Sequence, residues 1–97
     1  MKFAGIIEYI QDKEKIQAIR PVHREYLAKL KANGQLAASG PFTDDFGALI
    51  IYEAASHEEA EKLLQGDPFH QNGIFVRYQL RPWNPVIGNL ELFAHLR

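Results

Sequence analysis

The chain of 97 residues carries 11 lysines and arginines against 12 aspartates and glutamates, a formal charge of -1, and it has no cysteine. This length suits one domain that buries only roughly 60–65% of its unfolded surface, so a second copy would add to a thin core. The composition excludes a disulfide framework, a thiolate nucleophile and a cysteine-containing zinc site, and the balanced charge argues against nucleic acid as a partner.

The first half of the chain predicts a strand, a helix and a second strand. Residues 3–10 (FAGIIEYI) are rich in β-branched and aromatic side chains, which is typical of a strand. Pro21 complicates the helix that follows, because either the main helix begins near Arg20 or a short leading turn bends there. Asn33-Gly34 is expected to end the helix, before a short strand over residues 35–39. The helical pattern consists of apolar or large residues three or four positions apart, namely Ile16, Ile19, His23, Tyr26, Leu27 and Leu30.

The second half repeats this plan. Residues 48–54 (ALIIYEA) predict a third strand, and Ser56 with Glu59 has the capping-box spacing that opens a helix. Gly66 is expected to end that helix, and turn residues lead to a fourth strand over residues 74–81. In this strand Ile74 and Val76 are expected to share one face with Tyr78 and Leu80. The order βαββαβ predicts an α+β protein of the ferredoxin-like type, with a four-stranded antiparallel sheet.

The first and third strands are central in that topology, and both are apolar without clear alternation. An open sheet with helices on one face alternates when its other face meets water. The pattern therefore favours a homodimer in which two such sheets pack together. The alternative is that short central strands simply tolerate apolar residues on both faces.

The sequence offers little support for membrane, cofactor or metal binding. The longest wholly apolar runs, such as residues 48–52, are far too short to cross a bilayer, and no signal peptide is evident. We therefore expect a cytoplasmic protein with no membrane association. The chain has no phosphate-binding glycine motif and no pair of histidines at helical spacing, so we expect no cofactor and no metal.

His23 is the main candidate for chemistry. It falls in the inward stripe of the first helix, and Asp67 closes the second helix, so the topology can bring the two together. A carboxylate on one ring nitrogen fixes the tautomer and leaves the other nitrogen as a base. The alternative is a structural pair, or an Asp67 that only forms a turn before Pro68.

Three other residues are weaker candidates for contact with a ligand. Arg20 can bind an anion or simply be solvated. Ser39, at a strand end, can contact a ligand or satisfy turn amides. Trp83 can wall a pocket or cover the edge of the core.

Several segments together resemble the YciI-like (YCII-related) family over about residues 1–83. They are RPVH at 20–23, GQLAASGP at 34–41, DPF at 67–69 and RPW at 81–83. The resemblance implies a dimeric α+β barrel with a His–Asp active site, carried here by His23 and Asp67. Related families with this barrel include isomerases, monooxygenases and dehydrochlorinase- or lyase-like enzymes.

Two functional hypotheses follow. In the first, the protein is a small cofactor-independent enzyme, lyase- or isomerase-like, whose His23–Asp67 pair performs acid–base chemistry on a small, cyclic or aromatic substrate. Arg20 and Ser39 would hold polar groups of the substrate, and Phe69 and Trp83 would form apolar walls. In the second, it is a non-catalytic small-molecule-binding or accessory dimeric domain, and the pair is structural.

Residues 84–97 form an extension beyond the domain of residues 1–83. Its apolar residues make it unsuited to float free in water. We expect it to pack on a partner subunit or in a higher assembly, and the alternative is a short helix that covers its own subunit. The apolar residues are Val86, Ile87, Leu90, Leu92, Phe93 and Leu96.

Overall fold

The computed structural model describes residues 1–96. The elements follow the order β1, α1, β2, β3, α2, α3, β4 and a final 3₁₀ turn, η1. Their bounds are β1 Lys2–Tyr9, α1 Lys13–Ala32, β2 Leu36–Pro41, β3 Gly47–Glu53, α2 His57–Gln65, α3 Pro68–Gln71, β4 Phe75–Trp83 and η1 Leu90–Phe93. None of the described helices is both long enough and apolar enough to span a membrane.

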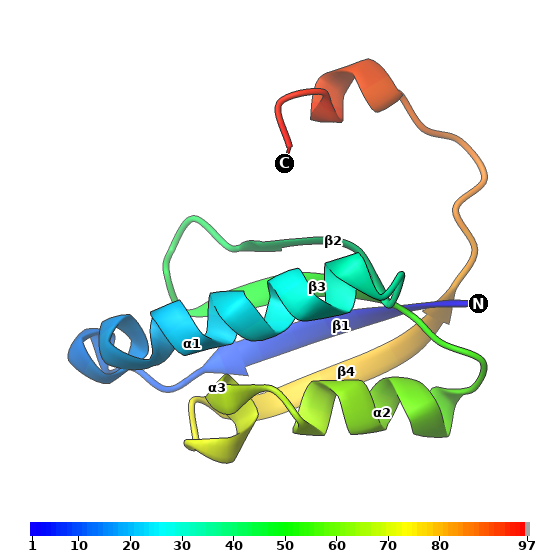
Figure 1. Ribbon diagram of the computed structural model, residues 1–97. Coiled ribbons are helices and arrows are strands. Elements are labelled where there is room, and N and C mark those ends of the chain that lie inside the picture. Colours follow the sequence, from blue (N-terminus) through cyan, green and yellow to red (C-terminus); the bar gives the residue numbers. More distant parts are fainter. Residues whose placement is uncertain (97) are drawn as a thin grey trace.

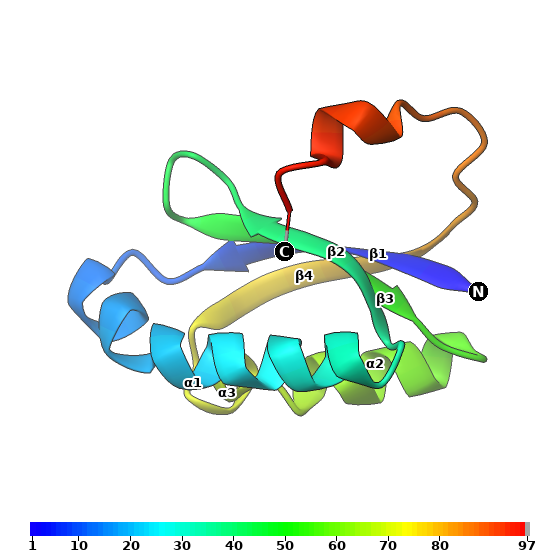
Figure 2. The same ribbon diagram turned by 45° about the horizontal axis from the view of Figure 1, so that its top comes forward.

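The four strands form one antiparallel sheet in the order β2-β3-β1-β4, which is the ferredoxin-like arrangement. The predicted fold class is therefore confirmed, with β1 and β3 in the centre. Figures 1 and 2 show α1, α2 and α3 on one face of the sheet and the C-terminal segment across the other face. The two faces of the sheet thus have different coverings.

Helix α1 is continuous through Pro21, so the prediction of a helix start near Arg20 or a separate leading turn is wrong. Asp12 is the N-cap of the helix, and its side chain accepts a hydrogen bond of 3.1 Å from the amide of Lys15. A proline in a helix interior costs about 3 kcal/mol. The buried residues of α1 lie on both sides of the proline, with Ile16 before it and His23 among those after it, and their burial offsets that cost.

A bulge in β4 corrects the predicted alternation of that strand. Glu8 pairs with Arg77 and Tyr9 pairs with Phe75, so one extra residue stands between the two pairs. Phe75 consequently faces the core together with Tyr9, whereas Val76 is exposed. The simple alternation resumes only after the bulge, where Tyr78 and Leu80 pack against the core.

The register of β2 determines which of its side chains face the helices. Ser39 pairs with Ile50 and Pro41 pairs with Ala48, and both partners on β3 point to the helix-covered face. Directly opposed residues in an antiparallel pair point the same way. Ser39 and Pro41 are thereby placed beneath α1.

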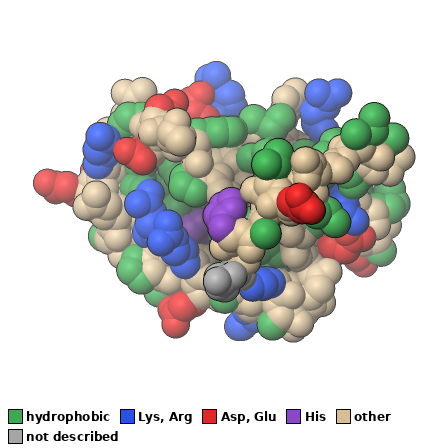
Figure 3. Space-filling view, turned by 90° about the horizontal axis from the view of Figure 1, so that it is seen from above, with side chains coloured by type: hydrophobic (Ala, Val, Ile, Leu, Met, Phe, Trp, Pro, Cys, Tyr) green, Lys and Arg blue, Asp and Glu red, His purple; other side chains and the backbone are tan. Residues whose placement is uncertain are grey.

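The core lies between the sheet and the helices, and the opposite sheet face, which the C-terminal segment crosses (Figure 2), is apolar and carries exposed side chains. Along β1, Phe3 and Ile7 are buried, whereas Ile6 between them is 43% exposed. Leu49 and Trp83 are similarly exposed on the outer face of the sheet. Seen from that side, hydrophobic side chains appear at several places among charged ones (Figure 3).

Tyr52 carries a buried hydroxyl with no hydrogen-bond partner within residues 1–96. Burial raises the pKa of this phenol above its usual range, so the group is a neutral donor without an acceptor. An unsatisfied buried donor costs about 1–3 kcal/mol. We expect Tyr52→Phe to raise the free energy of unfolding by about 1 kcal/mol, measured by urea denaturation with an unchanged m value.

Tyr26→Phe is the matched control for this substitution. Its hydroxyl donates a hydrogen bond of 2.7 Å to the carbonyl of Leu63, so we expect the same chemical change to destabilise the protein there. A loss of stability in both variants would contradict the account of Tyr52.

Candidate active site

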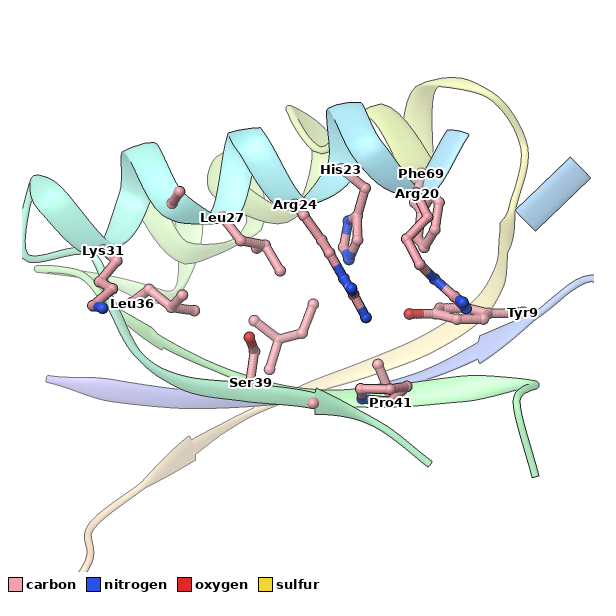
Figure 4. Close-up of a pocket in the computed structure, with 14 residues that line it drawn as sticks. Tyr9, Arg20, His23, Arg24, Leu27, Lys31, Leu36, Ser39, Pro41 and Phe69 are labelled. Atoms are coloured by element: carbon pink, nitrogen blue, oxygen red, sulfur yellow. The ribbon is translucent and has the colours of Figure 1, made fainter. Parts of the chain in front are cut away.

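A cavity of about 310 Å³ lies between α1 and the sheet, on the helix-covered face (Figure 4). Its walls come from α1, from β2 and β3, from the last residue of β1 and from α3. Figure 4 shows that side chains from the helix and from the strands extend toward a common space. The lining residues are Tyr9, Arg20, His23, Arg24, Leu27, Ala28, Lys31, Leu36, Ser39, Gly40, Pro41, Ala48, Ile50 and Phe69.

His23 and Asp67 meet at the inner wall of this cavity. Nδ1 of His23 lies 2.7 Å from Oδ1 and 2.9 Å from Oδ2 of Asp67. Because an ionised carboxylate only accepts hydrogen bonds, Nδ1 carries the proton and donates it to Asp67. Nε2 of His23 has no hydrogen-bond partner among residues 1–96, and the ring lines the cavity. The arrangement therefore leaves Nε2 as a proton acceptor that a bound molecule can reach.

The chain positions Asp67 by placing it between two helices. Gly66 ends α2, and Asp67 is the N-cap of α3, with Pro68 in the first helical position. Oδ1 of Asp67 also accepts a hydrogen bond of 2.9 Å from the amide of Phe69. The carboxylate is 0% exposed, so its negative charge is balanced by the imidazole and the amide rather than by water.

Close packing at Gly66 brings the end of α2 against α1. A Cβ at this position would stand 2.7 Å from the hydroxyl oxygen of Tyr26, which no real Cβ tolerates. The glycine thus lets Tyr26 approach and bind the carbonyl of Leu63, as described above. The same approach places the residue after Gly66, which is Asp67, opposite His23 on α1.

Phe69 packs against one face of the imidazole ring of His23. Its ring stacks on the ring of His23 with a centroid distance of 3.9 Å and an angle of 5° between the planes. Phe69 is itself buried against Tyr9 and Phe75. The stack and the hydrogen bond to Asp67 together fix the orientation of the imidazole.

The structure brings five of the six residues singled out from the sequence to one place. Arg20, Ser39 and Phe69 line the cavity with His23, and Asp67 lies directly behind that histidine. Trp83 does not join them, which corrects its expected position in this site within one subunit. It ends β4 on the outer face of the sheet, where it lines a different apolar space with Leu49 and Leu90. The physical reason is its register, because Trp83 pairs with Lys2 on the outward side of β1.

Sequence reasoning missed Tyr9 and Arg24. Tyr9 lies at the end of an apolar strand and looks like an ordinary core aromatic. Arg24 follows His23 directly and lies one helical turn after Arg20, which is a spacing that puts both guanidinium groups on one side of a helix. That spacing, next to a candidate catalytic histidine, is the pattern that could have revealed Arg24.

The site as described is suited to proton transfer. Within residues 1–96 no group of three or more histidine, cysteine, aspartate or glutamate side chains is arranged to hold a metal ion. The groups at hand are a paired imidazole, two guanidinium groups, a phenol and a hydroxyl, from His23, Arg20, Arg24, Tyr9 and Ser39. These supply a base, hydrogen-bond donors and positive charge around a partly apolar space.

A family model for the YCII-related domain matches residues 1–84. The chain belongs to this family. A YCII-related protein was expected from the RPVH, GP and DPF elements, and that expectation is confirmed.

The chain is similar to a protein of Bacillus subtilis and to a solved structure from Burkholderia phenoliruptrix. The uncharacterized protein YjpA of Bacillus subtilis (strain 168) is 39% identical over 51 residues, which are 53% of this chain and 60% of that protein. The aligned region thus spans less than two thirds of YjpA. Among solved structures, the chain is similar to the 5-chloro-2-hydroxyhydroquinone dehydrochlorinase TftG from Burkholderia phenoliruptrix AC1100, in complex with 2,5-dihydroxybenzoquinone. That match has a TM-score of 0.76 and 26% identity, and it covers 87% of this chain and 94% of the other.

Proposed function

We propose that this protein is a small enzyme that uses His23, oriented by Asp67, as a general base and acid on a small hydroxylated ring compound. The reaction is an elimination or an isomerisation and requires no cofactor. Arg20 and Ser39 hold polar groups of the substrate, and Phe69 forms an apolar wall.

The observation that carries this proposal is the buried His–Asp pair beside a cavity. Nδ1 of His23 is occupied by Asp67 at 2.7 Å, and the remaining ring nitrogen belongs to a side chain that lines a space of about 310 Å³. A purely structural pair needs no such access. Proton transfer by a positioned side chain contributes typically 10²–10⁴-fold in rate, which suits reactions of an activated substrate.

The chemistry can be written without an external oxidant. Nε2 of His23 removes a proton from the substrate, and the electron pair of the broken bond forms a new π bond. In an elimination the leaving group departs with its own bonding electrons, so the products include an acid and a more unsaturated ring. In an isomerisation the imidazolium returns the proton to a different substrate atom, which regenerates the neutral imidazole.

The comparison with TftG supports the class of reaction and of substrate. That protein is described as a dehydrochlorinase of a chlorinated hydroxyhydroquinone, and it holds a dihydroxybenzoquinone. Removal of hydrogen chloride is an elimination of the kind written above. A hydroxylated six-membered ring is also small enough for the cavity beneath α1.

The proposal is tested by turnover of chlorinated and unchlorinated di- and trihydroxybenzenes. Halide release and ultraviolet absorption would be followed with the wild-type protein and with His23→Gln. The proposal requires an elimination or isomerisation product with the wild type and its loss in the variant. A panel that the wild type leaves unchanged would refute it.

We also propose that the protein is a homodimer in which the outer faces of two sheets pack together. On this face Ile6, Leu49 and Trp83 are exposed to water in the single chain. Packed sheets lie about 10 Å apart, with interdigitating apolar side chains. A second copy of the same face supplies such a covering by two-fold symmetry.

The extension after Trp83 forms part of the same contact in this proposal. It crosses over the outer face of the sheet, as Figure 2 shows, and most of its apolar side chains are exposed. Ile87 is 95% exposed and Leu90 is 84% exposed. A space of about 710 Å³ lies between the sheet and η1, with apolar residues on both sides. A partner subunit that enters this space would bury the sheet and the extension together.

Deletion of residues 86–97 therefore tests the role of the extension. We expect the truncated protein to shift toward monomer at low concentration, because the contact loses its outer apolar side. Its melting temperature should also depend more strongly on protein concentration than that of the wild type. Light scattering and thermal unfolding over a range of concentrations measure both effects.

A double variant of the polar residues in the extension, Glu91→Gln with His95→Gln, is the matched control. It leaves every apolar side chain of the segment in place, so we expect the assembly of the wild type. Truncation with unchanged mass and unchanged stability would contradict the proposed contact.

A further inference from the structure

The cavity beneath α1 has a marked local excess of positive charge. Arg20, Arg24 and Lys31 line it, and no acidic side chain does. The chain as a whole has a charge of -1, so this excess is a property of the site and not of the protein. Asp67, which lies behind His23, is buried and already engaged by that ring and by a backbone amide.

Among residues 1–96, none of these three cations takes part in an ion pair. In the part of the chain that the structure describes, the salt bridges involve the N-terminus, Lys2, His23 and Lys62, and none involves Arg20, Arg24 or Lys31. Figure 4 shows that Arg20 and Arg24 extend from α1 toward the sheet. Both guanidinium groups thus reach the space over which His23 stands.

Tyr9 adds an uncharged donor to the same place. Its hydroxyl points into the space beneath the two arginines (Figure 4) and has no hydrogen-bond partner within residues 1–96. Burial, reinforced by the negative charge of Asp67, raises the pKa of Tyr9 to about 12, although Arg20 and Arg24 act in the opposite direction. The phenol therefore keeps its proton near neutral pH, and it leaves the charge of the arginines unbalanced.

We propose that Arg20, Arg24 and Tyr9 form a binding site for an anionic oxygen of the substrate, a carboxylate or a phenolate. This inference rests on the proposed function and specifies the substrate class as an anion. A guanidinium group matches such an oxygen with directed N–H donors, and the Tyr9 hydroxyl donates from the opposite side.

This site also fits the reaction assigned to His23. When a base removes a proton from a hydroxylated ring, negative charge develops on the oxygen atoms of the substrate. Donors fixed around that oxygen stabilise the charge as it forms, which is the usual way in which such sites accelerate proton transfer. Lys31, at the far end of the cavity in Figure 4, adds to the positive potential at longer range.

The effect of each cation is moderate, because Arg24 and Lys31 are exposed and Arg20 is half-buried. Charges in contact with water are screened by salt. Binding of an anion is therefore expected to weaken as the ionic strength rises, and binding of a neutral analogue is not.

The experiment compares matched probes in binding titrations followed by nuclear magnetic resonance. Benzoate with benzamide tests a carboxylate, and 4-nitrophenol, whose phenolate absorbs visible light, tests a phenolate. We expect benzoate to bind roughly tenfold more tightly than benzamide, or bound 4-nitrophenol to ionise at lower pH than the free compound. Arg24→Gln should remove most of this preference, and Tyr9→Phe part of it.

Lys29→Gln is the control, since Lys29 is on the same helix but outside the cavity. It should keep the preference of the wild type. The inference is overturned if neither anion is preferred, if neither probe binds at millimolar concentration, or if Arg24→Gln and Lys29→Gln behave alike.

Failure of this inference can be told apart from failure of the proposed function. His23→Gln should bind the anionic probes much as the wild type does while it loses turnover. Anion binding that depends on Arg24 in a protein without any turnover would refute only the acid–base role. Turnover that depends on His23, with no preference for anions, would refute only the anion site.

Discussion

We expect His23→Gln to reduce turnover by roughly 10²–10⁴-fold while the protein stays folded. The glutamine amide can donate a hydrogen bond to Asp67 and so keep the buried carboxylate paired, but it cannot accept a proton as an imidazole nitrogen does. The loss should appear mainly in kcat, because the arginines and Ser39 that hold the substrate are unchanged. Steady-state kinetics measure the loss of turnover, and circular dichroism with thermal unfolding tests whether the variant stays folded.

His57→Gln is the matched control for His23. His57 lies outside the cavity, on α2, where Nε2 is 2.8 Å from the carbonyl oxygen of Leu80 and the ring meets the edge of Phe3. We expect this variant to retain full turnover with a small change in stability. Equal turnover in wild type and His23→Gln, or equal losses in both histidine variants, would exclude His23 as the acid–base group.

The topology of the sheet was readable from the sequence because it depends on patterns that repeat over many residues. The spacing of Ser56 and Glu59 predicted the start of α2, and Ser56 does accept a hydrogen bond from the amide of Glu59. Gly34 has a φ of 74°, which the Asn33-Gly34 helix stop anticipates. Such local rules hold because each follows from backbone sterics or from a single side-chain hydrogen bond.

The errors occur where tertiary packing outweighs a local rule. Pro21 was expected to mark a boundary of α1, but Ile16 is buried ahead of it and His23 after it, so the helix continues. The alternation of β4 failed at its start, because a bulge that depends on pairing with Tyr9 turns Phe75 inward. Neither the burial of a helix face nor the register of a neighbouring strand can be read from the residue itself.

Some features of the candidate site were likewise predicted from the sequence, and others were not. The approach of Asp67 to His23 was anticipated from topology, although the expected helix start near Arg20 put His23 close to the end of its helix, and it lies in the middle. Tyr9 was missed because its place in the cavity depends on the direction in which its hydroxyl points, and the strand pattern does not reveal that direction. Trp83 was expected to wall the same pocket but lies on the other face of the sheet, because its motif gives no information on register.

We propose that the two faces of the sheet serve separate purposes. The helix-covered face holds the cavity and the His–Asp pair, whereas the outer face and the extension carry the apolar surface that we propose for a second copy. Side chains alternate across a strand, so neighbours such as Ile6 and Ile7 belong to different faces. A substitution on one face of the sheet therefore changes no side chain on the other face.

Asp67→Ala should be among the most destabilising single substitutions in the chain, with a loss of about 3–5 kcal/mol in the free energy of unfolding. The change leaves Nδ1 of the buried His23 without its partner and removes the cap that binds the amide of Phe69. A protein of this size has a total stability on the order of 5–15 kcal/mol, so a large share would disappear. Urea denaturation monitored by circular dichroism measures the free energy of unfolding. A loss below about 1 kcal/mol would contradict the stabilising role of the buried His23–Asp67 pair.

Asp67→Asn separates the positioning role of this side chain from its structural role. The asparagine oxygen can still accept a hydrogen bond from the amide of Phe69, so the cap of α3 is retained and the loss of stability should be smaller than with alanine. The asparagine NH2 group, however, takes the place of Oδ2, 2.9 Å from Nδ1, where a donor opposes the Nδ1 proton and favours the tautomer that carries the proton on Nε2. The nitrogen that lines the cavity then cannot act as a base, and we expect turnover to fall about as far as in His23→Gln. Steady-state kinetics of Asp67→Asn, at a temperature where the variant remains folded, measure this loss of turnover. Full activity in Asp67→Asn would show that the carboxylate does not set the tautomer of His23.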